Sequence, residues 1–212
     1  MNNENLLVSS SSLWSLFILH SSLFIPFSLF MNLTIPDLQQ KLKSWQGCEL
    51  AKTANPVLGE GNENAEIMFI GEAPGAKEDE LGRPFVGPAG KFLDELLESI
   101  GLKREDVYIS NVVKYRPPGN RDPLPEEKEQ CMPWLMMEIA LIKPKVIVPL
   151  GRHALAHFFQ KLSITEAHGK PQNISEKLTV FPIYHPAAAL HNGNLRQSLF
   201  DDFSALKKFL EQ

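Results

Sequence analysis

The amino-acid sequence predicts an α/β fold, a three-layer α/β/α sandwich around a central, mainly parallel four-stranded sheet. Two observations carry this prediction. Short apolar runs alternate along the chain with longer amphipathic segments, and a long loop rich in glycine and proline follows the first apolar run. Strands that alternate with helices build parallel sheets with both faces covered. With 212 residues and 43% hydrophobic content, the chain is long enough for one domain with a sizeable core.

The elements expected in the first half of the domain are two helices and two strands. Leucines at helical spacing predict a short helix over Asp37–Trp45. The uniformly apolar Ile67–Ile70 is typical of a buried strand, and the amphipathic Ala89–Ile100 predicts a helix. Val107–Val113 is a second apolar strand, which the cluster Pro117-Pro118-Gly119 ends.

The second half is expected to add three helices and two strands. A proline followed by two acids opens a helix over Pro125–Ile142, as suits a helix N-terminus. Val146–Leu150 is the third strand, and a helix over residues 151–160 follows it. Leu178–Ile183 is the fourth strand, and Leu195–Leu210 is the terminal helix.

Residues 1–30 differ in composition from residues 31–212, which we take as the domain. The segment is rich in Leu, Phe and Ile, but serines, a histidine and a proline interrupt it. It only loosely approaches the roughly 20 apolar residues that span a membrane. Glu4 is the only charge before Asp37, so the basic region of a secretory signal is missing. We interpret the segment as an extension foreign to the domain, with Met31 as an alternative start; a membrane anchor is the other interpretation.

The charge balance and the cysteine count bound the partners and the compartment. Twenty-one basic against 25 acidic residues give a net charge of −4, so any contact with DNA must be local. The candidate stretch is Lys114–Arg121, which contains three basic residues and no acid. Two cysteines argue against a disulfide-built secreted domain and favour a reducing, cytoplasmic location.

The loop Gly71–Gly90 is the most informative segment of the chain. It contains five glycines and three prolines between a predicted strand and a predicted helix. Glycine permits close approach of the backbone to a ligand, and loops this long in compact domains are usually functional. Open α/β sheets bind ligands at the carboxyl ends of their strands. The loop therefore predicts a binding site.

Four ordered motifs resemble those of the family 4 uracil-DNA glycosylases. The first is Gly-Glu-Ala-Pro-Gly from Gly71, with Glu78-Asp79 and Pro84-Phe85-Val86-Gly87 behind it. The other three are YISNVVK at 108–114, RPPGNR at 116–121 and YHPAAAL at 184–190. The resemblance extends from about Leu38 to near the C-terminus. It implies a monomeric DNA repair enzyme that hydrolyses the N-glycosidic bond of uracil in DNA and leaves an abasic site, with uracil-containing DNA as its partner and no membrane partner.

The resemblance implies the roles of four residues that could supply the chemistry. Phe85 would stack on uracil, Asn111 would read its edge through a side-chain amide, and His185 would donate to uracil O2 as negative charge accumulates. Glu72 would position the attacking water. The alternatives are a loop anchor for Phe85, a turn cap for Asn111 and a satisfied core residue for His185.

Gly71, Ala73 and Glu78 complete the expected substrate site. Ala73 stands where the better-studied glycosylase family has an aspartate in the loop, so Glu72 takes the water-positioning role here. Glu78 could fill the space near Gly75, where that family uses an aromatic side chain against the thymine methyl group. A solvated loop carboxylate is the alternative for Glu78.

The expected DNA contacts fall into three groups. Backbone amides at a helix N-terminus bind phosphate, basic side chains bind further phosphates, and an apolar side chain enters the gap that the flipped base leaves. In this chain the groups are Gly87, Ala89 and Gly90; Lys114, Arg116 and Arg121; and Leu190. A solvated basic stretch is the alternative for the second group.

The family usually carries four cysteines that ligate a four-iron, four-sulfur cluster. The corresponding positions in this chain are Trp45, Cys48, Tyr115 and Cys131. Thiolates hold such clusters, generally four of them. We therefore predict that the cluster is lost, that no metal or other cofactor is bound, and that the two aromatic side chains fill its place.

Two other functions remain open from the sequence. One is a related protein that binds uracil-DNA without turnover, and the other is a nucleotide-binding α/β protein. A trapping branch of the superfamily inserts a basic, histidine-containing loop after Asn-Val-Val-Lys, but here the chain continues directly into Tyr115-Arg116-Pro117. The Gly-x-x-x-x-Gly-Lys-Ser/Thr and Gly-x-Gly-x-x-Gly motifs are both missing from the sequence, which counts against nucleotide binding.

Overall fold

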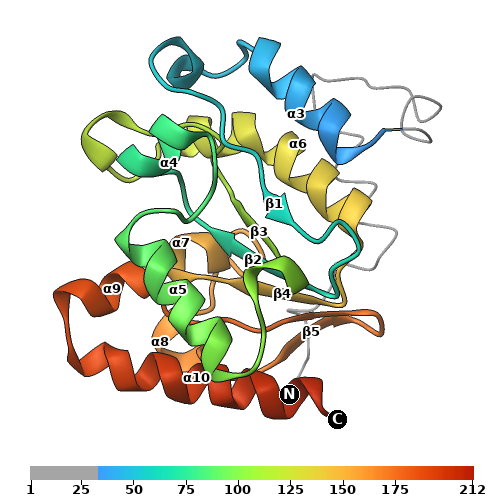
Figure 1. Ribbon diagram of the computed structural model, residues 1–212, viewed down its shortest axis with the longest axis vertical. Helices are drawn as coiled ribbons and strands as arrows, with labels where there is room; N and C mark the ends of the chain where they lie inside the picture. Colours follow the sequence, from blue (N-terminus) through green and yellow to red (C-terminus); the bar gives the residue numbers. More distant parts are fainter. Residues whose placement is uncertain (1–32) are drawn as a thin grey trace.

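A central, mostly parallel sheet organises the protein in the computed structural model, which describes residues 33–212 (Figure 1). Four strands pair in parallel in the order β3 (Tyr108–Asn111), β2 (Ile67–Gly71), β4 (Val146–Pro149) and β6 (Leu178–Val180). Helices α3 (Ile35–Ser44) and α6 (Pro125–Ile142) lie on one side of this sheet, and α5 (Pro88–Ser99) and α10 (Asn194–Leu210) lie on the other (Figure 1). The predicted α/β fold is confirmed.

The prediction of four strands is wrong, because the sheet formed by residues 33–212 has six strands. β1 (Glu60–Gly61) pairs with β3, and β5 (Gln172–Ser175) pairs with β6; both pairings are antiparallel. β1 has two residues, too few for a periodic pattern, and β5 is polar at three of its four positions. Neither edge strand therefore carries the apolar run that marked the four central strands.

The central strand β2 is apolar throughout because helices cover both of its faces. Met68 and Ile70 pack in the core beneath α3 and α6. Ile67 and Phe69 pack on the opposite face with α5 and α10, where the Phe69 ring stacks on Phe203 with centroids 5.8 Å apart. All five strand residues are buried, which makes β2 a rigid support for the loop that follows it.

Several helices differ from the expectation in their bounds. α3 begins two residues earlier than expected, at Ile35, because the Thr34 hydroxyl and the Asp37 carboxylate form a capping box. α7 (Gly151–Leu155) stops well before residue 160. Three short helices were not expected: α4 (Ala76–Leu81), α8 (Ile164–Ala167) and α9 (Pro186–His191). Short 3₁₀ turns complete the described chain: η1 (Glu49–Lys52), η2 (Arg104–Asp106) and η3 (Pro118–Asn120).

The predicted extension over residues 1–30 lies outside the described residues. Within residues 33–212, every helix is too short or too polar to cross a lipid bilayer.

Candidate active site

A cavity of about 310 Å³ lies at the carboxyl ends of β2 and β3. Its lining includes the four residues expected to carry chemistry, Glu72, Phe85, Asn111 and His185. Ala73 and Glu78, also expected at the substrate site, lie on the same wall. Parallel strands bring their carboxyl ends to one edge of the sheet, so side chains distant in sequence meet there.

Gly71 makes room for two of these side chains at the end of β2. A Cβ atom at this position would lie 2.4 Å from Asn111 Oδ1 and 2.6 Å from Phe85 Cζ, closer than real contacts allow. Asn111 ends the neighbouring strand β3 and is buried, and its register partner is Gly71. The absence of a side chain at Gly71 therefore brings the Asn111 amide and the Phe85 ring together.

Glu78 supports the loop that carries Phe85. Its Oε1 atom accepts hydrogen bonds from the backbone N–H groups of Val86 (2.8 Å) and Gly87 (2.7 Å). Its Oε2 atom would lie 2.8 Å from a Cβ atom at Gly75, so the carboxylate occupies the space beside that glycine. The placement follows from α4, which begins after Gly75 and which sequence patterning did not predict.

His185 is held at the start of α9 with its imidazole partly buried. Its Nδ1 atom accepts a hydrogen bond from the N–H of Ala187 (3.1 Å), so the proton of the neutral ring sits on Nε2. Burial, with a smaller contribution from His153, lowers the pKa of His185 to about 4. The ring also stacks against Phe85, with centroids 5.7 Å apart and planes inclined by 27°. At neutral pH the site therefore offers an uncharged N–H donor beside an aromatic face.

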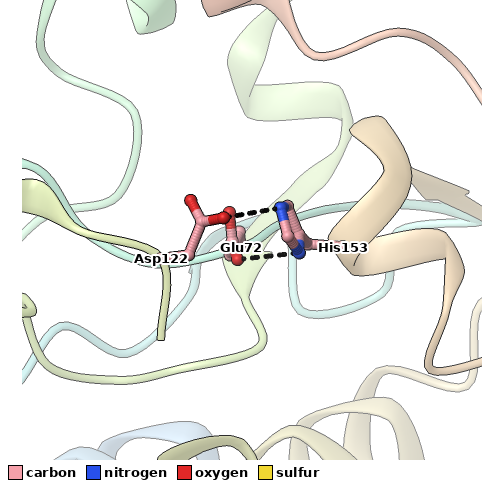
Figure 2. Close-up of side chains that lie close together, drawn as sticks. All are labelled: Glu72, Asp122 and His153. Atoms are coloured by element: carbon pink, nitrogen blue, oxygen red, sulfur yellow. Dashed lines mark ion pairs between the residues drawn. The ribbon is translucent and has the colours of Figure 1, made fainter. Parts of the chain in front are cut away.

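Glu72 lies beside His153 of α7 (Figure 2). His153 Nδ1 lies 3.3 Å from Glu72 Oε1, and its Nε2 lies 3.2 Å from Asp122 Oδ2. Burial raises the pKa of Glu72 and lowers the pKa of His153. Lys128 Nζ lies 3.6 Å from Glu72 and Arg152 Nη2 lies 3.6 Å from Asp122, so protein cations balance both carboxylates. We read the group as an ion-pair network rather than a metal centre.

A signal for His153 was present in the sequence. It lies in the first turn of α7, directly after β4, and therefore at the same edge of the sheet as Glu72. Asp122, which belongs to the loop before α6, had no comparable signal.

Comparisons with known proteins identify the family. A family model described as the uracil DNA glycosylase superfamily matches residues 58–208. The type-4 uracil-DNA glycosylase of Sulfurisphaera tokodaii is 46% identical over 185 residues, covering 82% of this chain and 84% of the relative. That of Saccharolobus solfataricus is 49% identical over 183 residues, covering 82% and 85%. The chain belongs to the uracil-DNA glycosylase superfamily. The resemblance predicted from the four motifs is confirmed.

One residue expected to bind DNA in this superfamily member is buried instead. The Lys114 side chain has no exposed surface, and its Nζ pairs with the equally buried Glu138 carboxylate of α6. The same ammonium donates to Ser110 Oγ (2.8 Å) and to the Asn111 carbonyl (2.6 Å). The prediction that Lys114 binds phosphate is therefore wrong, because burial among these acceptors removes it from the surface.

Three of the remaining DNA candidates keep exposed surface, and one of them, Arg121, also lines the cavity. Arg116 is partly exposed and donates to Asn120 Oδ1 (2.6 Å). Arg121 is exposed and pairs with Glu127 of α6 at 2.6 Å, which neutralises part of its charge. Leu190 on α9 keeps 48% of its surface exposed, as an apolar group that contacts DNA requires. Their contacts with DNA stay predictions.

The glycine-rich start of α5 is less open to phosphate than its sequence suggests. The Gly87 amide already donates to Glu78, so it is not free for an anion. Gly90 is buried, and a Cβ atom there would lie 1.8 Å from the Phe85 carbonyl oxygen. Ala89 lies on the cavity wall, in the first turn of a helix where backbone amides have no intrahelical partner.

The four positions at which the resemblance predicts cluster ligands, Trp45, Cys48, Tyr115 and Cys131, form a compact apolar cluster. Cys48 and Cys131 are buried, and the neighbouring Cys131 thiol lowers the pKa of Cys48. The Trp45 and Tyr115 rings stack with centroids 6.0 Å apart, and the Tyr115 hydroxyl donates to the Leu42 carbonyl (3.0 Å). Two thiols and two aromatic rings do not provide the ligand set of a four-iron cluster.

Proposed function

We propose that this chain is a uracil-DNA glycosylase that hydrolyses the N-glycosidic bond of uracil in DNA and leaves an abasic site. The observation that carries the proposal is the convergence of Phe85, Asn111, His185 and Glu72 on one cavity. The chain is also 46% identical to a type-4 uracil-DNA glycosylase over most of both lengths. These groups match the needs of base excision, which requires a stacking surface, an edge reader, an anion stabiliser and a group that orients water.

Base recognition begins with extrusion of the nucleotide from the helix. Enzymes that act on a base flip it into a fitted pocket and read it by stacking and by hydrogen bonds to its Watson–Crick edge. We assign stacking to Phe85 and edge reading to the Asn111 amide, which can donate and accept at once. The Asn111 side chain is buried at the end of β3 against Gly71, which supports a rigid reading geometry.

Bond cleavage leaves negative charge on the departing base, and His185 is suited to stabilise it. A neutral imidazole with its proton on Nε2 is an N–H donor that is itself uncharged until about pH 4. Its hydrogen bond strengthens as the uracil oxygen becomes anionic, which favours the transition state over the ground state.

Water attack on the sugar completes the reaction, and we assign its orientation to Glu72. Burial raises the pKa of this carboxyl group above its ordinary value, which favours its uptake of a proton. His153 Nδ1 lies 3.3 Å from one oxygen of this carboxylate. His153 is accordingly a positioning residue in this assignment.

We further propose that the enzyme works without an iron–sulfur cluster or other cofactor, as a monomer in a reducing cytoplasm. The paired thiols of Cys48 and Cys131, with the stacked rings of Trp45 and Tyr115, support the first part. Two free buried cysteines support the second.

The test is incubation of excess enzyme with an end-labelled oligonucleotide that contains one uracil, followed by alkali. The expected result is strand cleavage at the uracil only after alkali, because excision leaves the backbone intact. A Glu72→Gln, His185→Ala double variant is the matched control and is expected to leave the strand resistant. A parent protein that retards the oligonucleotide on a gel but yields no alkali-labile site would instead be a binding protein without turnover.

A further inference from the structure

The Phe85 backbone adopts a conformation that its side chain disfavours. Its φ angle is +52°, in the left-handed region that residues with a Cβ atom rarely occupy. The residue is 5% exposed and its ring stacks on His185. Strained backbone at a binding site persists only when surrounding contacts hold it in place.

Arg104 supplies such contacts from the turn η2, which precedes β3. Its Nη1 donates to the Phe85 carbonyl (2.9 Å), and its Nη2 donates to the Pro84 carbonyl. The guanidinium is in turn fixed by Glu60 of β1, whose Oε1 lies 3.1 Å from Nε, and by Asp94 of α5, whose Oδ1 lies 3.1 Å from Nη1. The planar guanidinium group of Arg104 therefore links β1 and α5 to the two carbonyls of the strained turn.

The same turn is held from its other end by Glu78, which accepts from the amides of Val86 and Gly87. Carbonyls at Pro84 and Phe85 thus face a cation, and amides at the next two residues face an anion. Gly90 leaves the space that the Phe85 carbonyl needs. Four polar groups of three consecutive peptide units are therefore hydrogen-bonded on both sides of the ring.

We propose that Arg104 is a positioning residue of the active site, which acts through Phe85 by holding its carbonyl and so fixes the ring against which the flipped base stacks. The expected effect on uracil excision rests on the proposed function. The claim that Arg104 holds the loop does not depend on that function. Arg104 itself has no place in the cavity lining.

The first experiment is a double-mutant cycle on single-turnover uracil excision. Arg104→Ala is expected to lower kcat/KM by about 10- to 100-fold, the range for loss of support to a strained residue. In a Phe85→Ala background the same change is expected to cost less than about 3-fold, because residues that act through one group are not additive. Equal losses in both backgrounds would overturn the proposal.

Two further variants test whether the effect of Arg104 comes from its two-pronged hydrogen bonding rather than from its charge or from a general loss of stability. Arg104→Lys keeps the charge, but its single ammonium does not span two carbonyls, so most of the loss is expected to remain. Arg83→Gln is the matched control, because Arg83 pairs with the same Glu60 carboxylate at 2.7 Å but is 58% exposed and donates to neither carbonyl. It is expected to stay within about 2-fold of the parent, as surface pairs contribute little.

The second experiment measures the protection of the loop's backbone amides and does not depend on enzyme activity. Hydrogen–deuterium exchange with mass spectrometry is expected to show faster exchange over residues 82–90 in Arg104→Ala than in Arg83→Gln, with peptides of β2 unchanged. Unchanged exchange in a folded Arg104→Ala protein would overturn the proposal whatever the enzyme does. Faster loop exchange in a protein whose parent does not excise uracil would uphold the positioning role and refute the proposed function.

Discussion

Replacing His185 with alanine is expected to remove the group that stabilises the departing base. The structure places its Nδ1 as acceptor for the Ala187 amide, so Nε2 is left as the donor. Loss of one donor of this kind typically lowers the chemical rate by about 100- to 1000-fold, or about 2.7–4 kcal/mol of transition-state stabilisation. DNA affinity should change little, because the charge on uracil appears only as the bond breaks.

The assay is single-turnover excision over a range of enzyme concentrations, which separates the rate of the chemical step from the apparent affinity. His185→Gln is the matched variant, since an amide keeps an uncharged N–H donor and is expected to recover part of the loss. An alanine variant that excises within about 3-fold of the parent rate would refute the assignment, as the remaining rate would exceed what loss of this donor allows.

The pH dependence gives a second check on the state of His185. Its folded-state pKa of about 4 lies below the ordinary 6.5, so the ring is neutral at pH 5–8 and becomes cationic only as pH falls through about 4. The unfolded chain takes up this proton at higher pH, so acidification from about 6.5 to 4 destabilises the fold through this residue. Imidazole NMR resonances that titrate near pH 6.5 would contradict the buried neutral ring.

Three other predictions follow from the surroundings of the site. Lys114→Met is expected to lower the free energy of unfolding in urea by about 3–5 kcal/mol, because Glu138 is left as an uncompensated buried charge; a loss below about 1 kcal/mol would contradict the buried pair. Arg116→Gln is expected to lower the slope of log affinity against log salt by about 1, and an unchanged slope would place the DNA track elsewhere. The purified protein is expected to be colourless and free of stoichiometric iron, with Cys48→Ser, Cys131→Ser still active; brown protein with iron in an elemental analysis would contradict this.

The sequence predicted the central sheet because its strands are apolar on both faces. Ile67–Ile70 and Val146–Leu150 were located within a residue or two, since strands covered on both sides leave a continuous apolar run. β5 has the sequence Gln-Asn-Ile-Ser and lies at an edge, so it leaves no such run. β5 forms by pairing with β6, and the local hydrophobicity pattern of its own residues does not predict that pairing.

The motifs predicted which side chains meet at the cavity, and their roles stay predictions; the placement of Lys114 was wrong because a distant partner determines it. Asn111 ends β3 and His185 follows β6, and the parallel topology brings both to one edge of the sheet, where Phe85 joins them from the loop between α4 and α5. Lys114 also follows a strand, but Glu138 on α6 removes it from the surface. The local sequence around a basic residue that follows a strand is the same whether its side chain faces DNA or a buried carboxylate, so the local sequence does not distinguish the two.

The most direct test of the account compares two oligonucleotides that differ only in the C5 methyl group of one base, uracil against thymine. Single-turnover incubation with the parent protein, followed by alkali, measures excision from each. The predicted result is cleavage of the uracil strand and survival of the thymine strand, because Phe85, Asn111 and Glu78 line the cavity that the motifs assign to uracil. Survival of both strands, or cleavage of both at similar rates, would contradict the assignment of this cavity to uracil excision.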